Sequence, residues 1–308
     1  MTLFSVGNVV VDIVARVPAL PERGSDVLAT ASGMSPGGSF NAMVAAVRQG
    51  LPTAYAGGHG TGVFGDLVRS RMRESGIRIL LPPTAELDTG YDVAIIDDGG
   101  ERTFITSFGA EARLAREDLA SVEPAPGDFV LVSGYGLLER TNGAVLAPWL
   151  TALDPGVRVL LDPGPLVVDI RPAVWAEALE RANWLSCNER EAMLLTGATD
   201  AASAIAELAK RSAGVLVRLG ARGCVLAVAG QVRPIAGFAV EAVDTNGAGD
   251  AHSGAFLAGL AAGLPPGAAA VRANASAAIA VSRFGPATAP TLDEVVALVR
   301  SARRENES

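Results

Sequence analysis

The sequence of 308 residues carries 25 basic and 33 acidic residues, a formal net charge of −8, and gives no sign of the basic surface by which proteins bind nucleic acid. Apolar residues make up 49% of the chain, enough for a sizeable core, and the two cysteines provide neither a disulfide framework nor a metal-ligand spacing. No basic n-region of a signal peptide precedes the first apolar run, and the apolar stretch 251–271 is broken by Pro265 and Pro266, which favours a buried helix over a membrane span. We therefore expect a cytoplasmic protein with no nucleic-acid or membrane partner.

The first predicted element is a buried strand over residues 3–12, a β-branched run that ends at the polar Asp12. Further strands of this kind alternate with amphipathic helices along the chain. The strands are predicted at 130–132, 157–161, 184–186 and 215–219, and the helices at 64–74, 173–181 and 201–211. Such alternation is typical of an α/β fold with a doubly wound, mainly parallel sheet flanked by helices.

Between residues 91 and 107 the pattern changes to two short strands around the turn 97–100, as in a β-hairpin. A hairpin that interrupts an α/β fold is a candidate lid. We expect a single domain over residues 1–308, with a small β-sheet lid built from segments at about 12–35 and 88–108.

The strongest chemical signal is the segment 243–257, in which Gly247-Ala248-Gly249 turns the chain and a helix of small residues is predicted to begin at Asp250. A helix N-terminus presents unpaired N–H groups and the positive end of the helix dipole, and glycines let a phosphate approach such a site closely. The Asp250 carboxylate could then take the proton of an attacking hydroxyl. An ordinary N-capping aspartate after a glycine turn is the competing interpretation, and the local pattern does not choose between the two.

The segment 60–65 matches the G-x-G-x-x-G pattern of dinucleotide-binding proteins. Such a fold needs an acidic residue at the end of the next strand, but the run 77–81 ends in two prolines instead. We interpret this segment as a strand-to-helix turn, and the preceding His59 as a structural residue. No Walker-type G-x-x-x-x-G-K-[ST] is present in the sequence, which leaves phosphate binding to residues 247–250.

Five segments, in order along nearly the whole chain, resemble the motifs of the ribokinase-like carbohydrate kinases, the PfkB family. The segment 243–257 is similar to the C-terminal signature of that family, Asp-Thr-Thr-Gly-Ala-Gly-Asp-x-Phe. The other four segments are 7–12, Gly-Asn-Val-Val-Val-Asp; 36–42, Pro-Gly-Gly-Ser-Phe-Asn-Ala; 188–191, Asn-Glu-Arg-Glu; and 218–223, Arg-Leu-Gly-Ala-Arg-Gly.

The resemblance implies a kinase that transfers the γ-phosphoryl of ATP to a sugar hydroxyl with the help of Mg²⁺, and a homodimer through the lid is a candidate assembly. The resemblance also implies that Asp250 is the catalytic base and that Gly247, Ala248 and Gly249 form the anion hole. We expect ATP to lie along the carboxyl ends of the later strands and the acceptor to lie between sheet and lid. The candidate acceptor-binding residues are Asp12, Gly37, Gly38, Asn41, Arg102 and Tyr135; the candidate ATP-binding residues are Asn188, Arg218, Gly220, Gly223 and Asn274; the candidate Mg²⁺ ligand, through water, is Glu191.

Two residues depart from the family signature. Asn246 stands where the family usually has threonine, at a position that contributes with Asp244 to a monovalent-cation site in many members, so we expect potassium stimulation to be weak or absent. His252 stands where the family usually has phenylalanine, and we interpret it as a packing residue. The pair Asn188 and Glu191 also has the i, i+3 spacing of a helix capping box.

Three functions remain open at this stage. A sugar kinase is favoured over a nucleoside kinase of the same family because aromatic residues, which would stack on a nucleobase, make up only 5% of the chain. A sugar-binding or regulatory protein without catalysis is the third, and the intact Asp250 and Gly-Ala-Gly loop argue against it. An oxidoreductase built on residues 60–65 is a more distant fourth.

Overall fold

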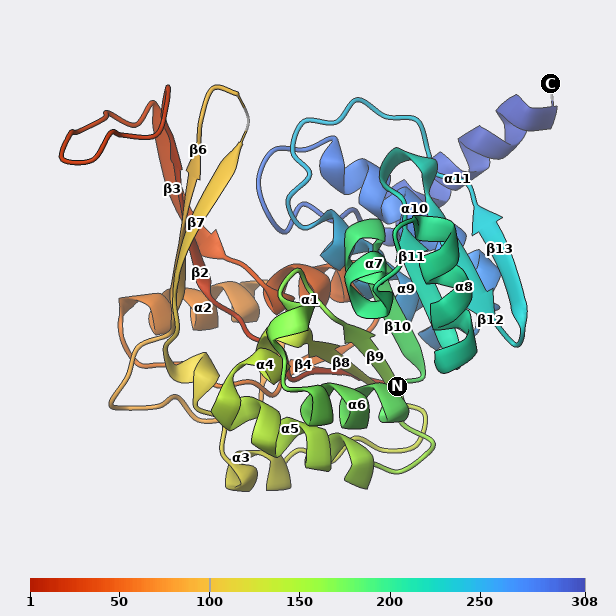
Figure 1. The fold of residues 1–308 in the computed structure, drawn as a ribbon, viewed down its shortest axis with the longest axis horizontal. Helices are drawn as coiled ribbons and strands as arrows, with labels where there is room; N and C mark the ends of the chain where they lie inside the picture. Colours follow the sequence, from red (N-terminus) through yellow and green to blue (C-terminus); the bar gives the residue numbers. More distant parts are fainter. Residues whose placement is uncertain (100, 308) are drawn as a thin grey trace.

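The described part of the chain forms two β-sheets, a large one of nine strands and a small one of four (Figure 1). A computed structural model describes residues 1–99 and 101–307, with the side chains of residues 102 and 305–307 left outside the description. The large sheet has the strand order β13-β12-β11-β10-β9-β8-β1-β4-β5, and its strands are parallel except for β12, which runs antiparallel to both neighbours. Its members are β1 (Leu3–Ser5), β4 (Thr53–Tyr55), β5 (Arg78–Ile79), β8 (Phe129–Ser133), β9 (Arg158–Asp162), β10 (Trp184–Asn188), β11 (Gly214–Arg218), β12 (Cys224–Val228) and β13 (Gln231–Ile235).

Helices cover both faces of the large sheet, so the predicted doubly wound α/β fold is confirmed. One face packs against α3 (Arg116–Ala120), α4 (Gly134–Leu138), α5 (Arg140–Ala152), α6 (Pro172–Arg181), α7 (Glu189–Thr196) and α8 (Ala201–Arg211). The other packs against α1 (Ser39–Arg48), α9 (Ala248–Ala261) and α10 (Pro266–Val281), while α2 (Val63–Glu74) packs beside α1 and α11 (Leu292–Glu307) packs on α10. None of the helices in the described residues has the length and apolar character needed to cross a bilayer.

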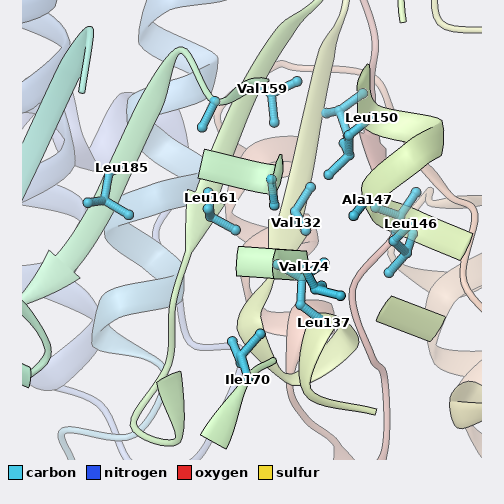
Figure 2. Packing of buried hydrophobic residues seen from close by; sticks show 14 of the residues in the cluster. Val132, Leu137, Leu146, Ala147, Leu150, Val159, Leu161, Ile170, Val174 and Leu185 are labelled. Atoms are coloured by element: carbon cyan, nitrogen blue, oxygen red, sulfur yellow. The ribbon is translucent and has the colours of Figure 1, made fainter. Parts of the chain in front are cut away.

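The core follows the alternation of side chains along each buried strand. In β8, Val130 and Val132 point into the cluster under α5 and α6, while Phe129 and Leu131 point to the opposite face and pack near Phe256 of α9. Figure 2 shows Val132 among leucines from the covering helices. Strands that are apolar on both faces need helices on both sides, as found in parallel sheets generally.

The small sheet stands to one side of the large one (Figure 1) and has the strand order β3-β2-β6-β7. Its strands are β2 (Val11–Arg16), β3 (Ala31–Pro36), β6 (Tyr91–Ile96) and β7 (Arg102–Ser107). The strands β6 and β7 form the predicted hairpin, and β2 pairs parallel with β6 and antiparallel with β3. The small sheet expected from residues 12–35 and 88–108 is therefore present.

Two predicted elements have different boundaries in the structure. The strand expected over 3–12 is interrupted, because the chain leaves the large sheet after Ser5 and enters the small sheet at Val11. At this crossing a side chain on Gly7 would place its Cβ 1.9 Å from the Ser39 hydroxyl, so only glycine fits. The helix expected from Asp250 begins two residues earlier, since Gly247 is its N-cap in the left-handed region at φ 71°.

The helices α1 and α9 approach each other closely at Gly254. A Cβ on Gly254 would lie 2.3 Å from the carbonyl oxygen of Ala42 and 2.8 Å from the Cβ of Ala45. Both atoms belong to α1, and neither is the end of a flexible side chain. The backbone of α9 therefore rests directly on α1.

This contact predicts that Gly254→Ala lowers the free energy of unfolding by about 1–3 kcal/mol, as overpacking of a close helix contact does. The matched control is Gly267→Ala in α10, where the new methyl meets only the guanidinium of Arg233 and the helix gains up to about 1 kcal/mol. Urea unfolding of both variants measures the difference. Equal or greater stability of the Gly254 variant would contradict the close approach.

Candidate active site

A cavity of about 520 Å³ lies between the small sheet and the carboxyl ends of the central strands of the large sheet. Its wall includes the ends of β8, β9 and β11, the first turn of α1, and the first turn of α9. The small sheet closes the opposite side with side chains from each of its four strands. Among the polar residues that line it are Asp12, Asn41, Glu191, Arg218 and Asp250.

The candidate base, Asp250, lies in the first turn of α9 on the cavity wall. Its carboxylate oxygen Oδ2 accepts a hydrogen bond of 3.4 Å from Nδ2 of Asn41, which lies in the first turn of α1. Burial, and after it the Asp162 carboxylate, raise the pKa of Asp250 to about 7 against the opposing effects of Arg218 and Asn41. A carboxyl group with a pKa near neutrality is well suited to exchange a proton with a hydroxyl at physiological pH.

The predicted anion hole, residues 247–249, lies at the start of α9 and lines the same cavity. The first N–H groups of a helix have no acceptor within the helix and are therefore suited to bind an anion. The N–H of Ala248 makes a long hydrogen bond of 3.4 Å to the carbonyl oxygen of Thr245. A Cβ on Gly249 would lie 3.2 Å from Cζ of Arg218, which shows that a guanidinium rests against this turn. Helix amides and a cation thus converge at one place.

Arg218, at the end of β11, is held by groups from neighbouring strands. Its Nη1 donates to Oδ2 of Asp162 at 3.0 Å and to Oγ of Ser186 at 2.7 Å, and its Nη2 lies 3.5 Å from Oε2 of Glu191. Ser186 in turn shares a hydrogen bond of 3.1 Å with Ser253 of α9. The sequence indicated Arg218 and Glu191 but not Asp162, which joins them only because β9, β10 and β11 are neighbours.

Glu191 forms the expected capping box and also faces the cavity, and its place at Mg²⁺ remains a prediction. With Asn188 it forms a reciprocal capping box of two 2.8 Å hydrogen bonds at the start of α7, and its side chain also lines the cavity. Burial and the nearby Asp162 raise the pKa of Glu191, while Arg218 lowers it. Asn188 itself holds the turn but does not line the cavity, so its place at ATP remains a prediction.

On the acceptor side, the predicted residues Asp12, Gly38 and Asn41 line the cavity. Gly37 lies against Asp12, because a Cβ there would fall 2.2 Å from the carboxylate. Gly38 is the N-cap of α1 with φ 58°, a conformation that side chains rarely adopt. Burial raises the pKa of Asp12 to about 7, and the neighbouring Asp92, which the sequence did not indicate, adds to the shift.

Two further predicted acceptor contacts have different outcomes. Tyr135 lines the cavity with 38% of its surface exposed, and burial raises the pKa of its hydroxyl, as do the carboxylates of Asp92 and Glu191. The side chain of Arg102 lies outside the described residues, so this candidate remains a prediction.

Besides Asn188, three more of the predicted ATP contacts do not line the cavity. Gly220 and Gly223 form the tight turn after β11, with φ 61° and 91°, beside Arg218. Asn274 is buried in α10, where its Nδ2 donates to the carbonyl oxygens of residues 235 and 236 and its Oδ1 lies 3.1 Å from Nε2 of His252. These hydrogen bonds hold the Asn274 side chain inside the protein, and its contact with ATP remains a prediction.

His252 is a buried residue of α9 and contacts Asn274 of α10. Burial lowers the pKa of His252 to about 3, with a further contribution from Arg218, so the ring is neutral at physiological pH. Its hydrogen bond to Asn274 and its burial at 2% exposure agree with the packing role predicted for it.

The glycine pattern at residues 60–65 is a strand-to-helix turn, as predicted. The carboxylate of Asp88 accepts hydrogen bonds from the backbone N–H groups of Phe64 and Gly65 and so occupies the start of α2. His59 is buried, with its ring bonded to the carbonyl oxygen of Leu81 at 3.0 Å and to Arg69. Neither the turn nor His59 lines the cavity.

Asp244 and Asn246 lie together at the cavity edge, before α9. Oδ1 of Asp244 accepts the backbone N–H of Asn246 at 2.9 Å, and Oδ2 accepts the N–H of Gly285 at 3.3 Å. The Asp244 side chain therefore ties the loop before α9 to the loop after α10.

The sequence is similar to those of known carbohydrate kinases. Residues 2–292 match the model of the pfkB family carbohydrate kinases. The uncharacterized sugar kinase YegV of Escherichia coli (strain K12) is 35% identical over 297 residues, which cover 94% of this chain and 92% of that protein.

Solved structures of ribokinases have the same fold. A ribokinase of Thermotoga maritima superposes with a TM-score of 0.85 at 25% identity, covering 97% of this chain and 99% of that one. A ribokinase of Arabidopsis thaliana, complexed with ribose and ATP, superposes with a TM-score of 0.79 at 25% identity, covering 97% and 98%. On its family match and on the sequence and fold it shares with these enzymes, the chain belongs to the pfkB family of carbohydrate kinases, which are phosphotransferases with an alcohol group as acceptor.

Proposed function

We propose that this protein transfers the γ-phosphoryl of ATP to a hydroxyl of a small sugar. The observation that carries the proposal is the position of Asp250, a carboxyl with a pKa raised to about 7, in the first turn of a helix whose amides face the same cavity. The Arabidopsis ribokinase, which shares the fold, was solved with ribose and ATP. Both substrates are expected to meet in the cavity described above.

In this proposal the acceptor lies between the small sheet and α1. Asp12 and Asn41 bind its hydroxyls, and the backbone at Gly37 and Gly38 lets it approach closely. The acceptor oxygen attacks the γ-phosphorus, the bond from that phosphorus to the bridging oxygen breaks, and the acceptor proton passes to Asp250 as ADP leaves. Closure of the small sheet as a lid would exclude water, which competes as acceptor.

The phosphates would lie on the first-turn amides of α9 beside Arg218. Charge that builds up on the transferring phosphoryl is best stabilised by donors fixed in place beforehand. Arg218 meets that condition because Asp162, Ser186 and Glu191 hold its guanidinium. The turn at Gly220 and Gly223, next to Arg218 in sequence, is proposed to contact the rest of the nucleotide.

Carboxylates near the phosphate position fit Mg²⁺. The described residues contain no cluster of three or more His, Cys, Asp or Glu that could hold a metal by themselves. Magnesium in phosphoryl-transfer sites commonly uses one or two carboxylates, waters and the substrate phosphates, so Asp162 and Glu191 suffice as protein ligands. A bound Mg²⁺ would neutralise charge on the β- and γ-phosphate oxygens.

A nucleoside is the second candidate acceptor, and the cavity wall supports it. Although aromatic residues are few in the chain, four of them line this cavity with exposed surface: Phe104, Phe108, Tyr135 and Phe284. Such rings could stack on a base. The low aromatic content of the sequence is therefore a weak argument against a nucleoside.

The first test is an ADP-release assay with ATP, Mg²⁺ and a panel of sugars and nucleosides. We expect acceptor-dependent ADP release that EDTA abolishes, and a kcat lower by about 10²–10⁴-fold in Asp250→Asn, the usual effect of losing a general base. The matched control is Asp293→Asn, which removes an exposed carboxylate from the first turn of α11. If Asp250→Asn kept most of the wild-type rate, or no acceptor were used, the proposal would fail.

The raised pKa of Asp250 predicts a pH dependence. Only the carboxylate form accepts a proton, so kcat/KM should fall about tenfold per pH unit below pH 7 and level off above it. Initial rates at subsaturating acceptor between pH 5 and 9, with ATP saturating, provide the profile. A rate that stays constant from pH 5 to 8 would exclude a base with this pKa.

Potassium should stimulate the enzyme little. The carboxylate oxygens of Asp244 already accept backbone N–H groups from Asn246 and Gly285, and Asn246 replaces the threonine usual in the family. Rates in potassium chloride are to be compared with rates in the chloride of a bulky organic cation at equal ionic strength. A difference of tenfold or more would refute the prediction.

A further inference from the structure

A polar row crosses the cavity face of the small sheet. Asp12 of β2 pairs with Ser35 of β3 on one side and with Asp92 of β6 on the other, and Asp92 pairs with Thr106 of β7. These four residues lie at one level of the sheet, and all four line the cavity. The strand register thus places two carboxylates side by side, about 5 Å apart between neighbouring strands.

We propose that Asp92 is a specificity-determining residue which, with Asp12, selects a hydroxylated acceptor that also carries a protonated amine. This inference rests on the proposed kinase function and narrows its acceptor class.

The pair lacks a positive partner among the described residues. Oδ1 of Asp92 is buried and has no hydrogen-bond partner, and the Thr106 hydroxyl is the group that lowers the pKa of this side chain. Two described cavity residues carry a positive charge, Arg16 and Arg218. Arg218 is already bonded to Asp162 and Glu191.

Arg16 is too far along the strand to help. It lies four residues beyond Asp12 in β2, about 13 Å at the usual rise of a strand. Its guanidinium packs over the ring of Phe284, 4.9 Å from the ring centre. The charge of the carboxylate pair therefore has to be balanced by a proton or by the ligand.

An ammonium group satisfies this pair better than a hydroxyl does. It brings a positive charge and three N–H donors, whereas each hydroxyl brings one donor and no charge. Burial, together with repulsion from Asp92, raises the pKa of Asp12 to about 7, and burial raises the pKa of Asp92. A cationic ligand would favour the charged form of both carboxyl groups. A diol alone could be bound by Asp12 without any second carboxylate.

The next level of the sheet limits the rest of the acceptor. Val14 pairs with Gly33 and Ala94, and Ala94 pairs with Phe104, so this level is apolar across all four strands. It lines the same cavity. A compact ring with an amine and a hydroxyl on one edge would place these groups at the two carboxylates and its carbon face against the apolar level. An amino sugar has this arrangement.

The test compares matched acceptors in the wild type and two variants. The pairs are glucosamine with glucose, galactosamine with galactose, and mannosamine with mannose, each measured by calorimetric binding and by ADP release. We expect the wild type to bind at least one amino sugar at least tenfold more tightly than its neutral partner. We expect Asp92→Asn to lower that ratio at least tenfold, with a melting temperature close to that of the wild type.

The charge-matched control is Asp98→Asn, which removes an exposed carboxylate from the hairpin turn of the same sheet and should keep the wild-type ratio. Asp92→Ala serves as a second variant in case Asp92→Asn folds poorly. The inference is overturned if no amino sugar binds, if every neutral partner binds as well, or if the ratio survives both substitutions. If only neutral sugars were phosphorylated, the inference would be wrong and the kinase function would stand. If amino sugars bound in an Asp92-dependent way without any ADP release, the inference on binding would stand and the kinase function would be wrong.

Discussion

The contact between α1 and α9 is the constraint on which the active site depends. Gly254 lets the backbone of α9 rest on the carbonyl of Ala42. One turn before Gly254, Asp250 comes within hydrogen-bonding distance of Asn41, the residue before Ala42. A wider separation of the helices would break that bond and would move the helix amides away from the acceptor. The alanine- and glycine-rich composition of α9 and α10 follows from this packing, because small side chains allow helices to lie close together.

Close packing of this kind brings many acidic groups into one cavity. Asp12 and Asp250 both have a pKa raised to about 7, chiefly by burial, and a single buried arginine is shared by Asp162 and Glu191. Such raised values mean that the folded protein keeps protons that the unfolded chain releases. The stabilisation of the folded state by these bound protons is therefore complete below a pH of about 4, and it is lost as the pH rises through about 7. The charges suited to proton transfer thus lower stability in the pH range where the base is active.

The sequence was sufficient for those parts of the fold and site that depend on local pattern. Alternating apolar runs predicted the parallel sheet, the turn at 97–100 predicted the hairpin, and the glycines before Asp250 predicted the helix start to within two residues. The local pattern failed between Ser5 and Val11, where one apolar run contributes to two sheets. The close approach of Ser39 to Gly7 at this crossing is a long-range contact that the pattern does not contain.

Residues whose importance depends on strand order were also missed. Asp162 and Asp92 carry no motif of their own, and each gains its partners only when strands distant in sequence become neighbours. Asn274 has the same dependence, because its amide is held by the carbonyl oxygens at the end of β13, which no local pattern indicates. Glycine turns and capping patterns are local and can be read from a sequence. Strand register and the direction of a buried side chain are long-range properties.

The contact between α1 and α9 also fixes when the enzyme can become active during its own synthesis. Asn41 and Asp250 are separated by 209 residues, which a ribosome adds in about 10–40 s at about 5–20 residues per second. Throughout that interval the apolar face of α1 that later meets α9, with Ala42 and Ala46, has no native cover. A nascent chain can therefore form the small sheet and its acceptor carboxylates early, but it gains its base and its anion hole only near the end of translation. The same interval is when the uncovered face of α1 is open to a chaperone or to misassociation with another nascent chain.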